Sequence, residues 1–259
     1  MTPPVPCPID QIELVLGADL HGVTKLASVE TVADLAELLG VLLAPPVDIP
    51  ITILDAERRG ALLGVKAVGG TVPAFVHLDW PWGELQEFDN AWAGKDLNRF
   101  EMRFRDRMLR AGVSSPHARF VCGALDEMIG NAQEHAGSQH PGLATFEVSR
   151  HWWMFSVTDF GVGIPFRLRE NSRYARLHDP DAISQALEHG VSTSSEEGRG
   201  LGFAQVFRAL ADRAAKLRVR SGRGLVTWEG LVAGTGTRDL SPRLARQGTH
   251  VRAAARIRK

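Results

Sequence analysis

The stretch "VTDFGVGIP", Val157–Pro165, decides how the second half of the chain is interpreted. It ends the apolar run "HWWMFS" with an aspartate, two glycines spaced by one residue, and a proline. A carboxylate at the end of a buried strand is costly unless a partner compensates it, and the amino group of adenine is one such partner. Gly161 and Gly163 would let a flat base lie against bare backbone. An ordinary glycine-rich turn is the alternative interpretation.

Two further glycine stretches extend this pattern toward a nucleotide. "EEGRGLGF" places Gly198, Gly200 and Gly202 around the start of an amphipathic helix predicted over residues 201–217. Backbone N–H groups at the start of a helix suit phosphates. "QGTHV" places Thr249 at the start of the last predicted strand, where its hydroxyl can bond a base or an ordered water. Taken alone, "EEGRGLGF" is also typical of a flexible loop at the start of a helix, and "QGTHV" does not indicate a nucleotide site.

The stretch "SSPHARFVCGALDEMIGNAQEHAG" predicts a helix that Ser115 caps. Its predicted core face is Val121, Leu125, Met128, Ile129 and Ala132. Glu127, Asn131 and His135 are spaced four apart and stack on another edge. The oxygen of Asn131 suits Mg²⁺, which prefers oxygen ligands. Glu127 can accept a proton from a group attacking a γ-phosphate. A partly exposed polar helix edge is the alternative.

The rest of this half predicts strands and helices in a short-looped order. We expect strands at 142–150, 151–159, 217–222, 225–230 and 249–257, and a helix over 179–190 that Asp179 caps. Short connections favour a mixed, mostly antiparallel sheet. With helices on one face, the fold class is α+β, a two-layer α/β sandwich.

The first part of the chain predicts a smaller α/β unit. We expect strands at 11–16 and 49–54, a helix at 28–40, and helical structure over 83–110, broken near Gly94. Residues 1–112 hold 10 basic and 16 acidic residues, a net charge of −6, and residues 113–259 hold +6. We therefore expect an N-terminal regulatory or docking region over 1–112 and a second domain over 113–259.

Four stretches in order, "LDEMIGNAQEHA", "VTDFGVGIP", "GRGLGF" and "GTHV", resemble the GHKL ATPase superfamily. This superfamily contains gyrase, heat-shock chaperone, histidine kinase and mismatch-repair ATPases. The resemblance covers residues 114–259 and implies the Bergerat fold, with ATP and Mg²⁺ as cofactors. By looser analogy, the N-terminal region resembles a partner-binding domain of the STAS kind.

The resemblance also implies a role for individual residues. Asn131 would hold Mg²⁺, Glu127 would be the catalytic base, and Asp159 would bind the adenine amine above Gly161 and Gly163. The remaining cofactor contacts would be His135, Ile164, Arg199, Gly200, Leu201, Gly202 and Thr249. Residues 166–198 would form a lid.

The chain departs from the gyrase type in two ways. Its first glycine box reads Asp-Phe-Gly, and its lid is short, which is closer to histidine kinases and anti-sigma serine kinases. Histidine kinases usually place a lysine three residues after the box asparagine, and here Glu134 occupies that position. Arg199, or one of the lid arginines Arg167, Arg169 and Arg173, would then contact phosphate instead.

The positions of the histidines do not decide which reaction the chain carries out. The predicted helix over 83–110 contains no histidine, and His117 lies on the Asn131 helix itself, so transfer to a histidine in cis is not expected. Three interpretations remain. The chain is an ATP-dependent kinase or switch acting on a partner protein, a slow ATPase whose lid closure drives homodimerisation, or a nucleotide-binding module without chemistry.

The composition and the terminal segments argue against several other classes of protein. Hydrophobic residues make up 44% and charged residues 23%, which is typical of globular proteins. The N-terminus does not resemble a signal peptide, and no apolar stretch is long enough to span a bilayer. Cys7 and Cys122 form no disulfide framework, so we expect a cytoplasmic protein. The basic C-terminal stretch accompanies no reader motif, so we expect no nucleic-acid partner.

Overall fold

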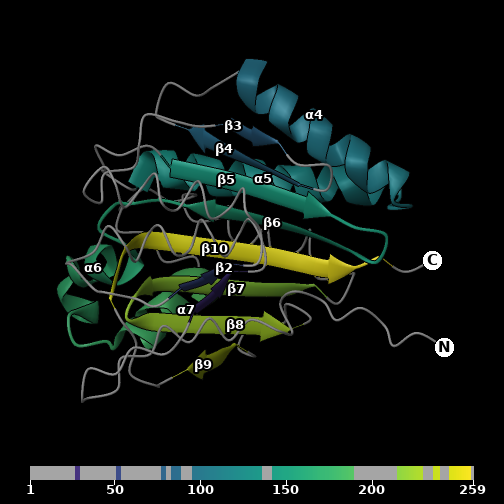
Figure 1. Ribbon diagram of the computed structural model, residues 1–259. Coiled ribbons are helices and arrows are strands. Elements are labelled where there is room, and N and C mark those ends of the chain that lie inside the picture. Colours follow the sequence, from purple (N-terminus) through teal and green to yellow (C-terminus); the bar gives the residue numbers. More distant parts are fainter. Residues whose placement is uncertain are drawn as a thin grey trace.

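The computed structural model describes residues 27–29, 51–53, 77–79, 83–88, 95–135, 142–189, 215–229, 236–239 and 245–257. An eight-stranded sheet dominates it, with strand order β3-β4-β5-β6-β10-β7-β8-β9 and every neighbouring pair antiparallel (Figure 1). The strands are β3 (His77–Asp79), β4 (Gly83–Phe88), β5 (Gly142–Val148), β6 (Trp152–Thr158), β7 (Lys216–Gly222), β8 (Gly224–Glu229), β9 (Thr237–Asp239) and β10 (Arg246–Arg256). A separate parallel pair joins β1 (Ala27–Val29) and β2 (Ile51–Ile53).

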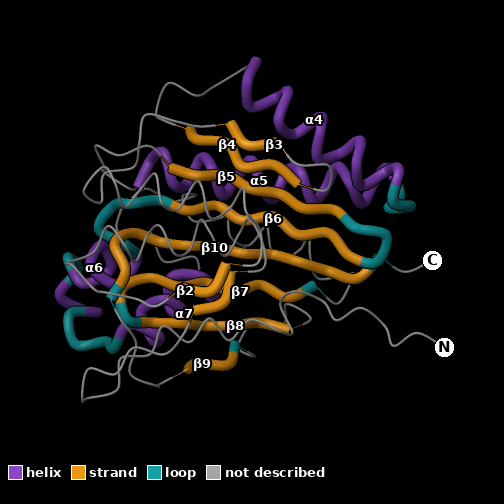
Figure 2. The backbone as a smooth tube through the Cα atoms, in the orientation of Figure 1, coloured by secondary structure: helices purple, strands orange, loops and turns teal. Residues whose placement is uncertain are grey.

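The helices form the second layer, behind the sheet in the view of Figures 1 and 2. They are α4 (Lys95–Arg110), α5 (Ser115–His135), α6 (Ile164–Arg169) and α7 (Asp179–His189), with a short 3₁₀ turn, η1 (Ser172–Tyr174). The predicted α+β two-layer sandwich with an antiparallel sheet and helices on one face is therefore confirmed. None of the helices in the described ranges is long and apolar enough to cross a membrane.

The core lies between the sheet and helices α4 and α5. The predicted apolar face of α5 is buried along its whole length: Val121, Leu125, Met128, Ile129 and Ala132. From α4, the ring of Phe104 stacks on that of Phe146 in β5, with centroids 4.9 Å apart. Phe100 also packs against Phe146, at 5.0 Å. Helix α4 thus belongs to the same core as α5 and the central strands.

The prediction of helix over 83–110 is correct for Lys95–Arg110 and wrong for Gly83–Phe88, which form β4. Strand β4 pairs with β3 on one side and β5 on the other. A side chain at Gly83 would place its Cβ 2.7 Å from both Glu147 Cγ and Phe146 O. Pairing with strands far along the chain overrides the helical propensity of this segment.

A buried ion pair fixes β4 to α4. Glu84 is fully buried, and Arg103 donates to its carboxylate through Nε at 2.8 Å and Nη2 at 2.5 Å. Removing one partner of such a pair would leave an uncompensated buried charge. The pair ties β4 and α4 together, so the sheet and its core extend across residue 112, the expected domain boundary.

Other predicted elements agree in part. The strands at 142–150, 151–159, 217–222, 225–230 and 249–257 are observed as β5, β6, β7, β8 and β10, and the strand at 49–54 as β2. The helix predicted over 201–217 is wrong at its end, because Lys216 and Leu217 begin β7. The helix predicted over 28–40 is wrong at its start, where residues 28 and 29 belong to β1. The strand at 11–16 and the rest of both helices lie outside the described residues.

A carboxyl group between α4 and α5 makes stability depend on pH. Glu101 Oε1 is buried without a hydrogen-bond partner in the described structure. Burial, followed by the nearby charge of Asp126, raises the pKa of Glu101 from 4.5 to about 7. Because the folded-state pKa is raised, the neutral form stabilises the fold, and that stabilisation is lost as pH rises from 4.5 through about 7.

We predict that Glu101→Gln removes this dependence. Allowing for partial exposure, the variant should gain about 1–2 kcal/mol over the wild type between pH 5 and pH 8. Urea unfolding at both pH values measures the difference. Asp106→Asn, an exposed position on the same helix, is the control and should leave the wild-type dependence unchanged. Parallel pH profiles for wild type and Glu101→Gln would contradict the assignment.

Candidate functional site

The candidate site begins where β6 ends. Asp159 follows the last residue of β6, and its backbone N–H donates to the carbonyl of Thr249 at 2.9 Å. The β6–β10 register, in which Thr158 faces His250, places Asp159 beside Thr249. The backbone N–H of Gly161 donates to Asp159 Oδ1 at 2.9 Å and closes the turn after the strand. Two predicted site residues from opposite ends of the domain thus meet directly.

The environment of Asp159 opposes its negative charge. Burial raises the pKa of the Asp159 carboxyl, while the N–H of Gly161, the charge of Arg246 and two hydrogen bonds from Thr249 act to lower it. Burial is the largest of these effects, so the ionised carboxylate lacks full compensation in the protein alone. A ligand that donates a hydrogen bond to this carboxylate would favour its ionised form.

Two glycines with positive φ hold this turn close to β10. Gly248 has φ +73°, and a Cβ there would lie 2.6 Å from Asp159 Oδ1 and closer still to its backbone. Gly163 has φ +82°, and a Cβ there would lie 2.6 Å from Ser221 Oγ. Residues other than glycine rarely adopt a positive φ, and a Cβ at either position would also lie too close to its neighbours. Both positions therefore require glycine for two separate reasons. Gly163 belonged to the predicted site for its contact with a base, and its backbone conformation is a further role.

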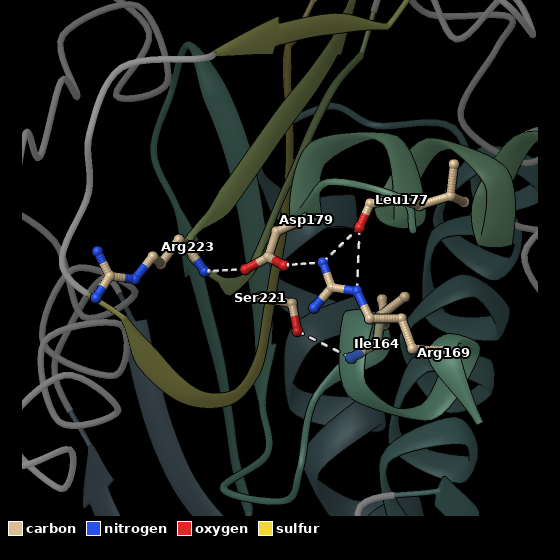
Figure 3. A network of polar contacts seen from close by, with 6 residues as sticks. All are labelled: Ile164, Arg169, Leu177, Asp179, Ser221 and Arg223. Carbon is tan, nitrogen blue, oxygen red and sulfur yellow. Dashed lines mark hydrogen bonds and ion pairs between the residues drawn. The ribbon is translucent and has the colours of Figure 1, made fainter. Parts of the chain in front are cut away.

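Ser221, near the end of β7, bonds to the turn after β6 (Figure 3) and also to β10. Its hydroxyl accepts from the N–H of Ile164 at 2.9 Å and donates to the carbonyl of Gly248 at 3.0 Å. The hydroxyl of Thr249 lies 3.1 Å away. Sequence reasoning missed Ser221, because its role depends on the β7–β10 register, in which it faces Thr249. We call Asp159, Gly161, Gly163, Ser221, Gly248 and Thr249 the strand-end cluster.

A second network lies next to the cluster (Figure 3). Arg169 donates to the carbonyl of Leu177, through Nε at 3.0 Å and Nη2 at 2.6 Å, and to Asp179 Oδ1 at 2.5 Å. The other oxygen of Asp179 accepts from the N–H of Arg223 at 2.7 Å. Asp179 was predicted to cap α7, and its carboxylate instead joins α6 to the β7–β8 turn. Arg169 is therefore engaged within the protein, which removes it from the arginines considered for phosphate.

The last turn of helix α5 lies at the same end of the sheet (Figure 1). Glu127 and Asn131 are both half-buried, and Asn131 Nδ2 is buried without a hydrogen-bond partner among the residues described. Six residues separate the end of α5 from β5, in which Leu143 faces Thr158 across the β5–β6 pair. In Figure 1 the end of α5, the end of β6 and α6 lie on one side of the molecule.

The structure thus brings together five of the predicted site residues, places Glu127 and Asn131 on α5 outside these contacts, and leaves the others undescribed. Those brought together are Asp159, Gly161, Gly163, Ile164 and Thr249. Arg199, Gly200, Leu201 and Gly202 lie outside the described residues, and the side chain of His135 is not described. Of the predicted lid, residues 166–189 form α6, η1 and α7, and the remainder lies outside the description.

Comparison with known families identifies the class of this site. The sequence pattern of the histidine kinase-, DNA gyrase B- and HSP90-like ATPases matches residues 117–253, more than half of the 259 residues. The chain belongs to this family and contains a GHKL-type ATP-binding domain with the Bergerat fold. The match spans α5, the strand-end cluster and most of β10. A comparison with characterised proteins gave no match.

Proposed function

We propose that the chain binds Mg-ATP between the strand-end cluster and the polar edge of α5, and transfers the γ-phosphoryl group to a partner protein as a signalling kinase or switch. The family implies ATP as the ligand. The observation that carries the placement is the Asp159 carboxylate, which the N–H of Gly161 holds at the end of β6, where the backbone of Asp159 also bonds Thr249. A cytoplasmic setting is part of the proposal, since Cys122 is a buried free thiol.

The adenine base would be recognised by Asp159. A carboxylate has several acceptor positions, so Asp159 can accept from an exocyclic amine while Oδ1 keeps the Gly161 N–H. The backbone from Gly161 to Gly163 would lie under the ring, and the hydroxyl of Thr249 would assist at its edge. Val162 is 45% exposed between the two glycines, which leaves apolar surface for a flat base to cover.

The triphosphate would extend toward α5. Asn131 is the proposed Mg²⁺ contact, through the oxygen of its side-chain amide. Mg²⁺ bound there would supply positive charge that offsets the charge of the phosphates. Within the described ranges no three His, Cys, Asp or Glu residues form a metal cluster. Glu127, one turn earlier on the helix, would accept the proton of the attacking hydroxyl.

The remaining phosphate contacts would come from the glycine stretch and the lid. We propose Arg199, Gly200, Leu201 and Gly202 for this role, with His135 at the end of α5 lining the site. Arg173 has an exposed side chain over the ring of Tyr174, with the guanidinium carbon 5.6 Å from the ring centroid, and can turn toward a phosphate. Arg167 makes only a partly exposed pair with Glu170 at 3.5 Å, which contributes little energy.

The phosphoryl acceptor would belong to another protein. Helix α4, the described helix that precedes the ATP-binding domain, contains no histidine. His117 is buried at the start of α5, with its ring centroid 6.0 Å from that of Trp153. A buried side chain packed on an aromatic ring is a poor acceptor of a phosphoryl group. These observations support transfer to a partner protein.

Replacing Asp159 with asparagine tests the placement of the base. Asparagine keeps an oxygen for the Gly161 N–H but loses the charge, and hydrogen bonds to charged groups contribute about 1.5–3 kcal/mol. Calorimetric titration should show ATP affinity weakened by about 10- to 150-fold. The thermal unfolding midpoint should not fall, because a poorly compensated buried charge is removed. Asp181→Asn on α7 should bind ATP as the wild type does, and full affinity in Asp159→Asn would overturn the placement.

A further inference from the structure

Strand β10 carries a bulge beside the turn that follows β6. Between Arg246 and Thr249 it advances three residues, from 246 to 249, while its partner β7 advances one, from 222 to 221. Gln247 and Gly248 are therefore extra residues in this strand. A bulge bends the strand that contains it and re-aims the neighbouring side chains. It thus decides where the side chains of Arg246 and Gln247 point.

Both side chains at the bulge contact the turn after β6. Gln247 Nε2 donates to the carbonyl of Phe160 at 2.7 Å. Arg246 Nη2 lies 3.5 Å from the carbonyl oxygen of Asp159, and its Nε donates to the carbonyl of Gln247 at 3.2 Å. Arg246 is only 4% exposed. A guanidinium group is thus enclosed against the backbone of the residue whose carboxylate forms the centre of the candidate site.

The charge of Arg246 acts on the carboxyl group of Asp159. Burial, the largest effect, raises the pKa of this carboxyl, and Arg246 is the charged group that lowers it among the residues described. An opposite charge nearby favours the ionised form of an acid. Other titratable groups near the turn have partners of their own: Arg169 bonds Asp179, Arg167 pairs with Glu170, and the ring of His250 bonds Thr158. Within the described part of the chain, Arg246 is therefore the cation that supports ionised Asp159.

We propose that Arg246 is a positioning residue for nucleotide binding, which the bulge places behind the Asp159 turn so that its charge keeps the carboxylate in the form that accepts from an adenine amine. The inference rests on the proposed function, because it assumes that Asp159 contacts the base. Arg246 would act through Asp159, since its Nε and Nη2 are directed at backbone carbonyls. Gln247 completes the arrangement by holding the carbonyl of Phe160.

The expected consequence is a change in how ATP affinity depends on pH. Binding needs ionised Asp159, so affinity falls as pH drops through the pKa of its carboxyl. Without the charge of Arg246 that pKa rises, and the fall begins at a higher pH. Each unit of rise lowers affinity about tenfold wherever the pH lies below the raised pKa. The ratio of wild-type to variant affinity should therefore be largest at low pH and shrink as pH rises.

Calorimetric titration of the full chain with Mg-ATP at low and high pH tests the proposal. At about pH 6, Arg246→Gln should bind ATP about tenfold or more weakly than the wild type, and at about pH 9 it should approach the wild type. Taking the ratio at each pH cancels the titration of the triphosphate itself. Arg246→Lys keeps the charge without the planar fork and should stay within about threefold of the wild type. Arg223→Gln is the control and should match the wild type, because it removes an exposed arginine whose side chain points away from the network in Figure 3.

A double variant separates action through Asp159 from a direct contact with phosphate. Adding Arg246→Gln to Asp159→Asn should cause no further loss of affinity, whereas a phosphate contact would add its loss independently. Additive losses, a loss that does not change with pH, or equal affinity of wild type and Arg246→Gln would overturn this inference and leave the proposed function standing. Absence of ATP binding in the wild type would overturn both. If circular dichroism shows that Arg246→Gln is unfolded, Arg246→Lys decides, and a folded lysine variant that loses about tenfold or more in affinity overturns the inference.

Discussion

Replacing Glu127 with alanine should lower phosphoryl transfer or ATP hydrolysis by about 100- to 10,000-fold, the usual contribution of a general base. ATP affinity should stay close to that of the wild type, because Glu127 would act on the attacking group. The position suits this role, since Glu127 is half-buried on the edge of α5 that carries Asn131, while Met128 and Ile129 anchor the helix in the core. Phosphate release and transfer of radiolabel from the γ-position of ATP measure the loss.

The neighbouring residue provides the control for Glu127. Asp126 is exposed on α5, and Asp126→Ala should retain wild-type turnover. Label that appears on a co-purified protein would identify a kinase, and label released only as phosphate would identify a slow ATPase. Wild-type turnover that survives in Glu127→Ala would contradict the role of this residue. Absence of turnover in the wild type with its partner present would make the domain a binding module.

Replacing Gly248 with alanine should destabilise the fold by about 2–5 kcal/mol. Left-handed backbone costs an L residue about 1–2 kcal/mol. The new Cβ would also approach the backbone and Oδ1 of Asp159, and forcing atoms into a packed site costs about 1–3 kcal/mol. The two costs add because they have separate causes. Urea unfolding of both proteins measures the difference.

Gly112 provides a control that separates the two costs. It has φ +97° in the turn before α5, and a Cβ there would meet no atom within 4 Å. Gly112→Ala should therefore lose only the backbone contribution of about 1–2 kcal/mol. Equal losses for the two variants would show that β10 and the turn after β6 are not in close contact.

Local patterns were sufficient to predict much of the ATP-binding domain. The apolar spacing from Val121 to Ala132 predicted the buried face of α5, because a helix repeats every 3.6 residues whatever lies beyond it. The runs around Gly142–Val148 and Trp152–Thr158 predicted a strand pair, because a short turn at residues 149–151 separates two apolar segments. The Asp159 turn was predictable because its glycines and aspartate are adjacent in sequence.

Contacts between distant segments set the features that sequence reasoning missed. Gly83–Phe88 becomes a strand because β3 and β5 pair with it, and these pairing partners cannot be read from the segment itself. Ser221 enters the site because β7 ends opposite Thr249, 28 residues later.

The most direct test of the proposed site is a comparison of ATP with inosine triphosphate by calorimetric titration of the folded wild-type chain with magnesium. Inosine carries a carbonyl oxygen where adenosine carries its amino group, so this analogue would bring an acceptor against the Asp159 carboxylate. Sites built to hydrogen-bond one group reject analogues that lack it, so inosine triphosphate should bind at least about 100-fold more weakly than ATP. Equal affinity for the two nucleotides, or no heat with ATP, would contradict recognition of adenine by Asp159.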